Sequence, residues 1–362
     1  MKFQCAAKGC RNPHTEAGKH NMRISLVTPA AAGSRSGNRT TADRWARFLR
    51  QMGHKVLVEE VWSGGISDLM IALHTRRSRH SIGRYAASHP DHPLIVVLTG
   101  TDLYRDIHFD GGAQDSLELA TRVVVLQEAG LAELGPRHRA KARVVYQSAE
   151  PILPQPQAKT FFDVCVVGNL RAEKDPFRCA LAAGSLPSTS RIRITHAGKA
   201  NSERFARRAM ALASTEPRYR WLGEVPRWRV RRLLSRAHLL VQSSVMEGGA
   251  NAVVEALAAG VPVIASRVAG NVGMLGEDYP GYYPVGDEKY LALLLERTET
   301  DAAFHELLKA RCASRRPLTV PEREREALGG LLEEVGWRSR DHAPARESSP
   351  EVILAPWTKK RA

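Results

Sequence analysis

Short apolar runs alternate with amphipathic segments along most of the chain. The runs are rich in Val, Ile and Leu, as in buried parallel strands, and the segments between them have helical spacing. The predicted strands of the first half are 23–28, 55–61, 68–74, 94–98, 122–126 and 142–146. Those of the second half are 162–168, 191–195, 219–222, 238–241, 261–265 and 281–285. This alternation predicts an α/β protein with parallel sheets.

A proline-rich segment, 149–159, separates the two arrays. It contains Pro151, Pro154 and Pro156, which favours a stiff linker. We therefore expect one Rossmann-like domain over 22–150 and a second over 151–313. Two further sets of residues are polar or rich in proline, and we expect a disordered N-terminal extension and a disordered tail there. These are residues 1–21 and residues 338–362.

Charge and cysteine content narrow the function classes. The 53 Lys and Arg residues exceed the 38 Asp and Glu residues and give a net charge of +15, which favours anionic ligands. Aromatic residues make up only 6% of the chain, and no basic helix or stacking motif suggests nucleic acid. The cysteines are scattered and odd in number, which favours a cytoplasmic location. No apolar run has the length of a membrane span.

One predicted strand-to-helix turn carries the most chemistry. It follows the apolar run 238–241, contains Glu247, Gly248 and Gly249, and leads into an Ala-rich helix that contains Glu255. Such a turn presents free backbone N–H groups and the positive end of a helix dipole. Two glycines allow a ligand to approach the backbone closely. Ionised carboxylates accept hydrogen bonds from hydroxyls, so the turn predicts a sugar nucleotide as ligand.

Three other loops follow predicted strands, at the sheet edge where open parallel sheets bind ligands. The loop 29–39 has Gly33 and Gly37 at a spacing that matches neither a dinucleotide fingerprint nor a P-loop. Two interpretations remain: a flexible loop in which Arg35 and Arg39 bind an anion, or an ordinary connection.

The other two loops contain further charged candidates. In 99–106, Asp102 is either a site residue or a helix N-cap. In 168–176, Arg171 and Lys174 are able to clamp a diphosphate, the first as a fork and the second as a point charge.

The two Rossmann-like halves, the linker and the Glu-x7-Glu turn resemble the GT-B retaining glycosyltransferases, the large family 4 that includes sucrose-phosphate and trehalose-type synthases. The resemblance spans about residues 22–335 and is most specific over 247–266. It implies two domains that face a cleft, the first for the acceptor and the second for a UDP-sugar donor. It also implies that a terminal helix within 314–337 packs back on the first domain.

The resemblance assigns roles to individual residues. Glu255 would bind the ribose hydroxyls, Glu247 the donor hexose, and Lys174 the phosphates. The family's partner arginine usually follows the glycine at Gly168, where this chain has Asn169. The donor-binding residues would be Gly37, Gly168, Arg171, Lys174, Glu247, Gly248, Gly249, Ala250, Asn251 and Glu255. The catalytic residues would be Lys174, Arg171 and Glu247, of which Lys174 and Arg171 would stabilise the negative charge on the leaving diphosphate.

A narrower resemblance concerns the acceptor. Thr28-Pro29 with 33–39, the stretch 98–106, and the stretch 270–276 look like the selenosugar synthases of selenoneine biosynthesis. That family joins selenophosphate to the sugar of a UDP-sugar, and an anionic selenium nucleophile needs little base catalysis. The resemblance implies a hexosyltransferase that uses UDP-glucose or UDP-N-acetylglucosamine. The acceptor-binding residues would be Gly33, Ser34, Arg35, Asn38, Arg39, Thr99, Asp102 and Arg105.

Four alternatives remain open at this stage. Two are enzymes: a family 4 glycosyltransferase with a hydroxyl acceptor, and an NDP-sugar epimerase of the same fold. Two are not enzymes: a sugar-nucleotide sensor and a nucleic-acid-binding protein. The chain has no Asp-x-Asp motif, so we expect no obligatory metal, and we expect no cofactor.

Overall fold

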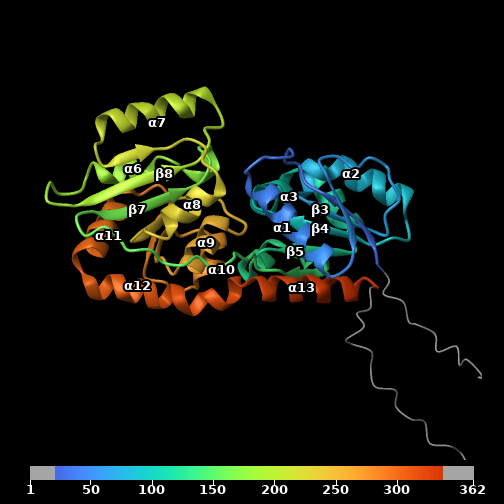
Figure 1. Ribbon diagram of the computed structural model, residues 1–362. Helices are drawn as coiled ribbons and strands as arrows, with labels where there is room; N and C mark the ends of the chain where they lie inside the picture. The colour runs from blue at the N-terminus through green and yellow to red at the C-terminus, as the bar shows by residue number, and fades with distance from the viewer. Residues whose placement is uncertain (1–20, 337–362) are drawn as a thin grey trace, which may run out of the picture.

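Two parallel six-stranded sheets form the centres of two lobes within residues 21–336, the part of the chain that the computed structural model describes (Figure 1). In the first sheet the order is β2-β1-β3-β4-β5-β6, and in the second it is β12-β11-β10-β7-β8-β9. The first-sheet strands are β1 (Arg23–Val27), β2 (Lys55–Glu59), β3 (Leu69–Leu73), β4 (Leu94–Leu98), β5 (Arg122–Val125) and β6 (Ala142–Val144). The second-sheet strands are β7 (Phe162–Val167), β8 (Ile192–Ala197), β9 (Tyr219–Trp221), β10 (Leu239–Gln242), β11 (Val263–Ser266) and β12 (Tyr282–Tyr283).

Every predicted strand overlaps one of these strands, so the predicted α/β class is confirmed. The helical elements of the first lobe are α1 (Gly37–Gln51), α2 (Thr75–Ser88), the π-helical turn η1 (Asp102–Asp106), α3 (Ile107–Phe109), α4 (Gly111–Leu119), η2 (Glu128–Glu133) and α5 (Pro136–Ala140). Those of the second lobe are η3 (Ala172–Lys174), α6 (Arg178–Ala183), α7 (Glu203–Thr215), α8 (Arg227–Leu234), α9 (Asn251–Ala259), α10 (Ala269–Leu275), α11 (Glu288–Thr300) and α12 (Ala302–Arg315). The chain then returns through η4 (Arg316–Thr319) and α13 (Pro321–Glu334).

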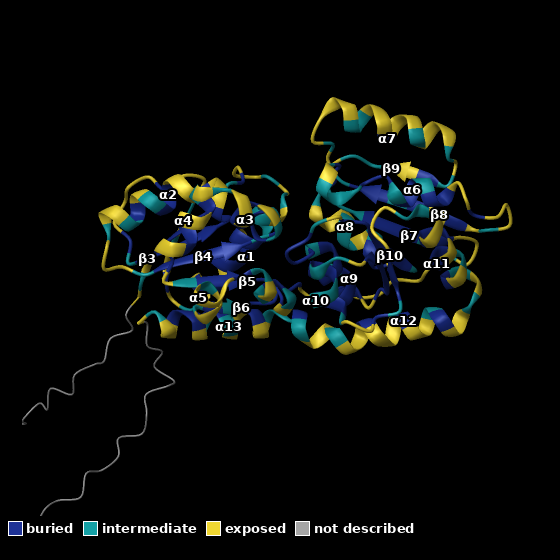
Figure 2. Cartoon of the chain, turned by 180° about the vertical axis from the view of Figure 1, so that it is seen from behind, coloured by how far each residue is buried: buried dark blue, intermediate teal, exposed yellow. Residues whose placement is uncertain are grey.

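Alternation along the strands explains why both faces of each sheet are covered. In β3, Leu69, Ile71 and Leu73 belong to the core beneath α1, whereas Met70 and Ala72 belong to the core beneath α2. All five residues of β3 are buried, as expected for a central parallel strand. Figure 2 shows the buried strands inside both lobes and the exposed outer faces of α7 and α12.

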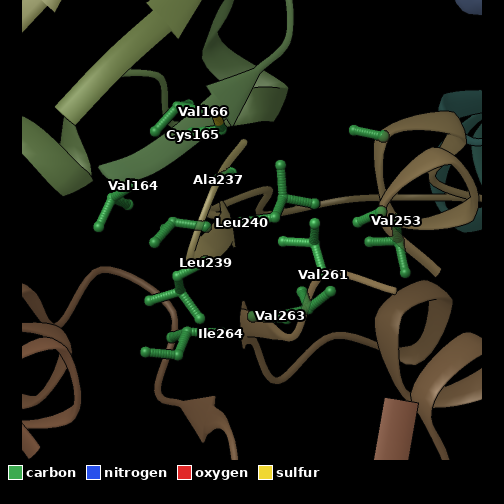
Figure 3. Close-up of a cluster of buried hydrophobic side chains, with 14 of the residues drawn as sticks. Val164, Cys165, Val166, Ala237, Leu239, Leu240, Val253, Val261, Val263 and Ile264 are labelled. Atoms are coloured by element: carbon green, nitrogen blue, oxygen red, sulfur yellow. The ribbon is translucent and has the colours of Figure 1, made fainter. Parts of the chain in front are cut away.

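The second domain has its own core around β7 and β10. Figure 3 shows Val164, Leu239, Val253 and Ile264 among the side chains of this cluster. Val253 comes from α9, so the helix that follows the Glu247 turn is anchored by the same core. The turn is therefore attached to rigid elements on both sides.

Two segments connect the domains. The proline-rich linker follows the second domain, where Ile152 N–H donates to the Ala258 carbonyl at 3.2 Å and Gln155 N–H donates to the Ser235 carbonyl at 2.7 Å. The helix α13 packs on α1 of the first domain and adds Leu328 to its core (Figure 1). The extension and tail expected over 1–21 and 338–362 lie outside the described residues, except for position 21.

Candidate active site between the domains

A cavity of about 840 Å³ lies between the two domains. It is bounded by residues that follow the carboxyl ends of strands in both sheets, the place where open parallel sheets bind ligands. Its first-domain wall includes Ser34, Arg35, Gly37, Asn38, Arg44, His74, Arg77, Thr99, Thr101 and Gln147. Its second-domain wall includes Gly168, Arg171, Lys174, Lys199, Asn201, Glu224, Arg227, Glu247, Gly249, Asn251 and Glu255.

The predicted site residues divide into two groups. Those that line the cavity are Gly37, Gly168, Arg171, Lys174, Glu247, Gly249, Asn251, Glu255, Ser34, Arg35, Asn38 and Thr99. Those that do not line it are Gly248, Ala250, Gly33, Arg39, Asp102 and Arg105. The second group is concentrated among the acceptor candidates of the first domain.

Lys174 and Glu247 form an ion pair at the second-domain wall. The Glu247 carboxylate is largely buried and also accepts hydrogen bonds from Gln242 Nε2 at 3.1 Å and Ser244 Oγ at 3.0 Å. The two loops are joined by the backbone as well, since Val245 N–H donates to the Glu173 carbonyl at 3.0 Å. A cation and an anion that are separated by a long stretch of sequence are thus held together in the cavity.

Glu255 lies on α9 and is paired with Arg227 Nε at 3.5 Å. Burial raises the pKa of the Glu255 carboxyl group, and the positive charges of Arg227, Arg231 and Arg44 partly oppose this shift. The carboxylate faces the cavity. A ligand that donated a hydrogen bond to it would therefore stabilise its ionised form.

The helices α1 and α9 both begin at the cavity, but only α1 has a side-chain cap. The Ser36 side chain accepts a hydrogen bond from Arg39 N–H, whereas α9 is preceded by Ala250, which has no side chain able to cap it. The first N–H groups of a helix favour anions when no side chain occupies them. The N-terminus of α9 is consequently the better anion site of the two.

The two glycines of the Glu247 turn lie at the contact between the domains. A Cβ atom at Gly248 would lie 2.4 Å from the Thr99 carbonyl oxygen, and one at Gly249 would lie 2.8 Å from Leu126 Cβ. A larger residue at either position would therefore collide with the first domain. The glycines allow the two domains to approach each other closely.

Asp102 is buried beneath the cavity wall and does not line it. Its carboxylate accepts hydrogen bonds from the backbone N–H groups of Thr99 at 2.9 Å, Gly100 at 2.9 Å and Thr75 at 3.1 Å. It therefore fixes the loop after β4 and the start of α2. Neither interpretation of the sequence anticipated this, because the N-cap expectation concerned the helix that Asp102 itself precedes.

Two arginines among the acceptor candidates, Arg39 and Arg105, also lie outside the wall and have protein partners. Arg39 pairs with Asp43 at 2.9 Å, and Arg105 pairs with Asp106 at 3.1 Å. Helix α1 begins at Gly37, so the last three residues of the loop expected over 29–39 belong to its first turn. The Ser36 cap was a signal in the sequence that the glycine pattern obscured.

Sequence reasoning missed His74, the last residue of a predicted strand. His74 Nδ1 accepts from Arg77 N–H at 3.4 Å, so Nε2 carries the proton and donates to Thr101 Oγ1 at 3.1 Å. Burial lowers the pKa of His74 in spite of the nearby Asp102 carboxylate. The residue has a left-handed φ of 71°, which is unusual for a side chain of this size. Its position at the carboxyl end of β3 was the feature by which the sequence could have identified His74 as a site candidate.

Arg44 was missed because its partner is remote in sequence. Its guanidinium forms a buried pair with Glu324 of α13 at 2.7 Å, and Glu324 also accepts from Trp45 Nε1 at 2.7 Å and Ser148 N–H at 2.8 Å. Arg44 also donates to Asn251 Oδ1 at 3.4 Å, at the start of α9. The C-terminal helix thus holds a cation in the first-domain wall.

The charge of the wall favours anionic ligands. Eight Lys and Arg side chains line the cavity, against four carboxylates. In a cavity with partly desolvated walls such an excess attracts phosphate groups. In the described part of the chain, no group of three or more His, Cys, Asp or Glu residues has an arrangement suited to a metal ion.

Comparison with solved structures defines the class of this fold. The structure of HepE from Anabaena in complex with UDP-glucose matches 87% of this chain and 100% of that chain, with a TM-score of 0.71 and 16% identity. The sucrose-phosphate synthase of Thermosynechococcus elongatus matches 87% and 99%, with a TM-score of 0.70 and 16% identity. The pneumococcal O-GlcNAc transferase GtfA in complex with UDP and GlcNAc matches 74% and 56%, with a TM-score of 0.59 and 17% identity. The architecture is therefore GT-B, as predicted.

The sequence comparison is specific to the second domain. Residues 151–311 match the family model described as glycosyl transferases group 1. This match covers the second domain, and the two-domain fold is that of the GT-B structures above. No helix within residues 21–336 is long and apolar enough to cross a membrane.

Proposed function

We propose that this protein is a glycosyltransferase that moves a hexose from a UDP-sugar to a small anionic acceptor. The observation that carries the proposal is the composition of one wall, where Glu247 and Glu255 lie beside Lys174 and the uncapped start of α9. Carboxylates accept hydrogen bonds from sugar hydroxyls, whereas an ammonium group and free N–H groups favour phosphate. HepE was solved with UDP-glucose and GtfA with UDP and GlcNAc, which supports UDP-glucose or UDP-N-acetylglucosamine as the donor.

In this proposal each part of the donor has a partner in the second domain. Glu255 accepts hydrogen bonds from the ribose hydroxyls, and Glu247 accepts from the hexose. Lys174, Arg171 and the first N–H groups of α9 bind the diphosphate. The pairing of Lys174 with Glu247 supports this arrangement, because a ligand with both phosphates and hydroxyls offers a new partner to each member of the pair.

The acceptor is proposed to lie against the first-domain wall. Arg35, Arg77, Thr99 and Thr101 line this wall, and together they suit a small anion with several oxygen atoms. This set revises the sequence-based one. Arg77 and Thr101 join Ser34, Arg35, Asn38 and Thr99, whereas Gly33, Arg39, Asp102 and Arg105 leave it. We propose selenophosphate as the acceptor on the resemblance of 33–39, 98–106 and 270–276 to selenosugar synthases.

The proposed reaction exchanges one bond at the hexose C1 atom. The bond from C1 to the β-phosphate oxygen breaks, and its electron pair leaves on UDP. A selenium lone pair forms the new C1–Se bond, and selenium has no proton to lose because selenophosphate is already anionic. Lys174 and Arg171 stabilise the charge that develops on the leaving diphosphate.

Mass spectrometry of the reaction products tests this proposal. The purified protein is incubated with UDP-glucose or UDP-N-acetylglucosamine, alone, with selenophosphate, or with inorganic phosphate as the matched control. We expect UDP and a selenium-containing sugar only with selenophosphate. Transfer to a hydroxyl acceptor with no selenium product would overturn selenophosphate as the acceptor but would leave the proposed glycosyl transfer standing. An altered sugar nucleotide without any acceptor would indicate an epimerase, and binding without turnover would indicate a sensor.

A further inference from the structure

Gln147 is a buried polar residue of the cavity wall that the proposed function leaves unused. It follows β6 at the end of the first domain, and only 2% of its surface is exposed. Its Nε2 donates to Thr41 Oγ1 at 2.6 Å, but its Oε1 makes no hydrogen bond within residues 21–336. A buried amide oxygen without a donor is uncommon in folded proteins and calls for an explanation.

The neighbouring hydrogen bonds fix the orientation of this amide. The Thr41 hydroxyl donates to the Gly37 carbonyl at 3.0 Å, so its proton is already in use. The hydroxyl oxygen must therefore accept from Gln147, which requires the amide NH2 group on that side. Oε1 is consequently turned away from Thr41 and is held as an acceptor.

Gln147 Oε1 lies close to the Glu247 turn. A Cβ atom at Gly249 would lie 3.5 Å from Gln147 Oε1, so the amide oxygen reaches across to the second domain at this turn. Glu247, two residues before Gly249, is the proposed partner of the hexose. The oxygen thus lies near the sugar end of the donor site, while Glu255 marks the ribose end.

We propose that Gln147 Oε1 accepts a hydrogen bond from one hydroxyl of the donor hexose and thereby selects which hexose is transferred. This inference rests on the proposed function. In the protein alone, Gln147 Oε1 is buried without a hydrogen-bond donor, and a hydroxyl of the substrate would supply that donor. A hexose that lacks this hydroxyl leaves Gln147 Oε1 without a donor, so kcat/KM for that hexose should be lower by about tenfold to a hundredfold.

Monodeoxy donors provide the test. The hexose that wild-type protein turns over is compared with analogues that each lack one of its hydroxyls, by kcat/KM for UDP release. We expect one analogue to be poor for wild-type protein. In Gln147→Met the natural donor should fall to the level of that analogue, so that the discrimination disappears while the other analogues keep their relative rates. Gln51→Met, at an exposed position at the end of α1, is the matched control and should keep the wild-type profile.

Two further variants separate a role in specificity from a structural role. Gln147→Glu keeps an acceptor oxygen toward the cavity but lacks the NH2 group that donates to Thr41, so it should retain part of the discrimination, even if Gln147→Met proves unstable. Thr41→Val removes the anchor and should weaken the discrimination without removing it. A Gln147→Met profile that matches wild type, or a Gln147→Glu protein that folds and loses all preference, would overturn the inference. Absence of turnover and binding for every UDP-sugar with wild-type protein would instead overturn the proposed function.

Discussion

The two walls of the cavity hold their polar groups in different ways. In the second-domain wall, charged groups pair with each other inside the cavity, as Lys174 does with Glu247 and Arg227 with Glu255. In the first-domain wall, Arg44 is held from behind by Glu324 of α13. The helix at the start of the second-domain wall is uncapped, whereas Ser36 caps its counterpart in the first domain.

This difference indicates what each wall contributes. Pairs within the cavity can exchange partners with an incoming ligand at little cost, because the ligand replaces one charge or hydrogen bond with another. A group that pairs with a protein residue outside the cavity, as Arg44 does with Glu324, keeps its position whether or not a ligand is present. This difference fits the proposal that the second-domain wall binds the donor and that the first-domain wall presents a fixed surface to the acceptor and the hexose.

The largest effect is expected when the support of the first-domain wall is removed. Glu324→Ala leaves Arg44 buried without its counterion and costs about 3–5 kcal/mol of unfolding free energy. Urea unfolding measures this cost, and Glu326→Ala, at an exposed position on the same helix, should change stability by no more than about 0.5 kcal/mol. Equal stabilities of the two variants would show that the first-domain wall does not depend on α13.

The next effect concerns catalysis at the second-domain wall. Lys174→Met removes the cation that is proposed to stabilise the leaving diphosphate, and kcat should fall by about 10²–10³-fold. Steady-state release of UDP measures this loss. Lys309→Met changes an exposed lysine that pairs with Glu306 far from the cavity, and it should leave kcat unaltered. A Lys174→Met enzyme with wild-type kcat would contradict the proposed role.

A moderate effect is expected for the ribose end of the donor site. Glu255→Gln keeps the shape of the side chain but lacks the negative charge, so UDP should bind about 10–100-fold more weakly, as for the loss of charge-assisted hydrogen bonds. Because burial raises the pKa of Glu255, acidification protonates this group at a higher pH than an exposed glutamate. UDP affinity of the wild-type protein should thus decrease as the pH falls through this raised pKa.

Calorimetric titration with UDP and with a dideoxy-ribose analogue of UDP tests the assignment. If Glu255 binds the ribose, Glu255→Gln should reduce the affinity for UDP and have little effect on the analogue. Equal losses for both ligands would place the ribose elsewhere. The pH dependence should also be weaker in Glu255→Gln.

The smallest effect tests the capped helix. Ser36→Ala removes the cap of α1 and should cost about 1 kcal/mol of stability. Ser202 stands at the same position before α7 but makes no capping hydrogen bond through its side chain, so Ser202→Ala should have little effect. Thermal unfolding distinguishes the two variants. UDP binding should survive in Ser36→Ala, because α9 and not α1 is proposed to bind the phosphates.

The elements that local pattern determines were predicted well. Apolar runs identified the strands, because buried parallel strands differ from their surroundings in composition as well as in spacing. The Glu247 turn was found because its carboxylates, glycines and helix start are contiguous in sequence. The family resemblance assigned Lys174 to the same donor site, and in the structure its side chain pairs with Glu247.

The first-domain wall could not be predicted in the same way. Arg44 depends on Glu324 and Gln147 depends on Thr41, and both partners are distant in sequence. The contact of Gly248 and Gly249 with the first domain could not be predicted either, because a sequence does not show which residues of another domain lie beside a turn. Asp102 was misassigned for a similar reason, since the N–H group of Thr75 that it binds belongs to a different strand-to-helix connection.

Hydrogen–deuterium exchange with and without UDP tests the central claim most directly. The account predicts that UDP protects the amides at the start of α9 and in the loop 168–174, because these groups are proposed to bind the diphosphate. Amides at the capped start of α1 should show a much smaller change. Protection that is concentrated at α1, or none at α9 at saturating UDP, would contradict the assignment of the donor to the second-domain wall.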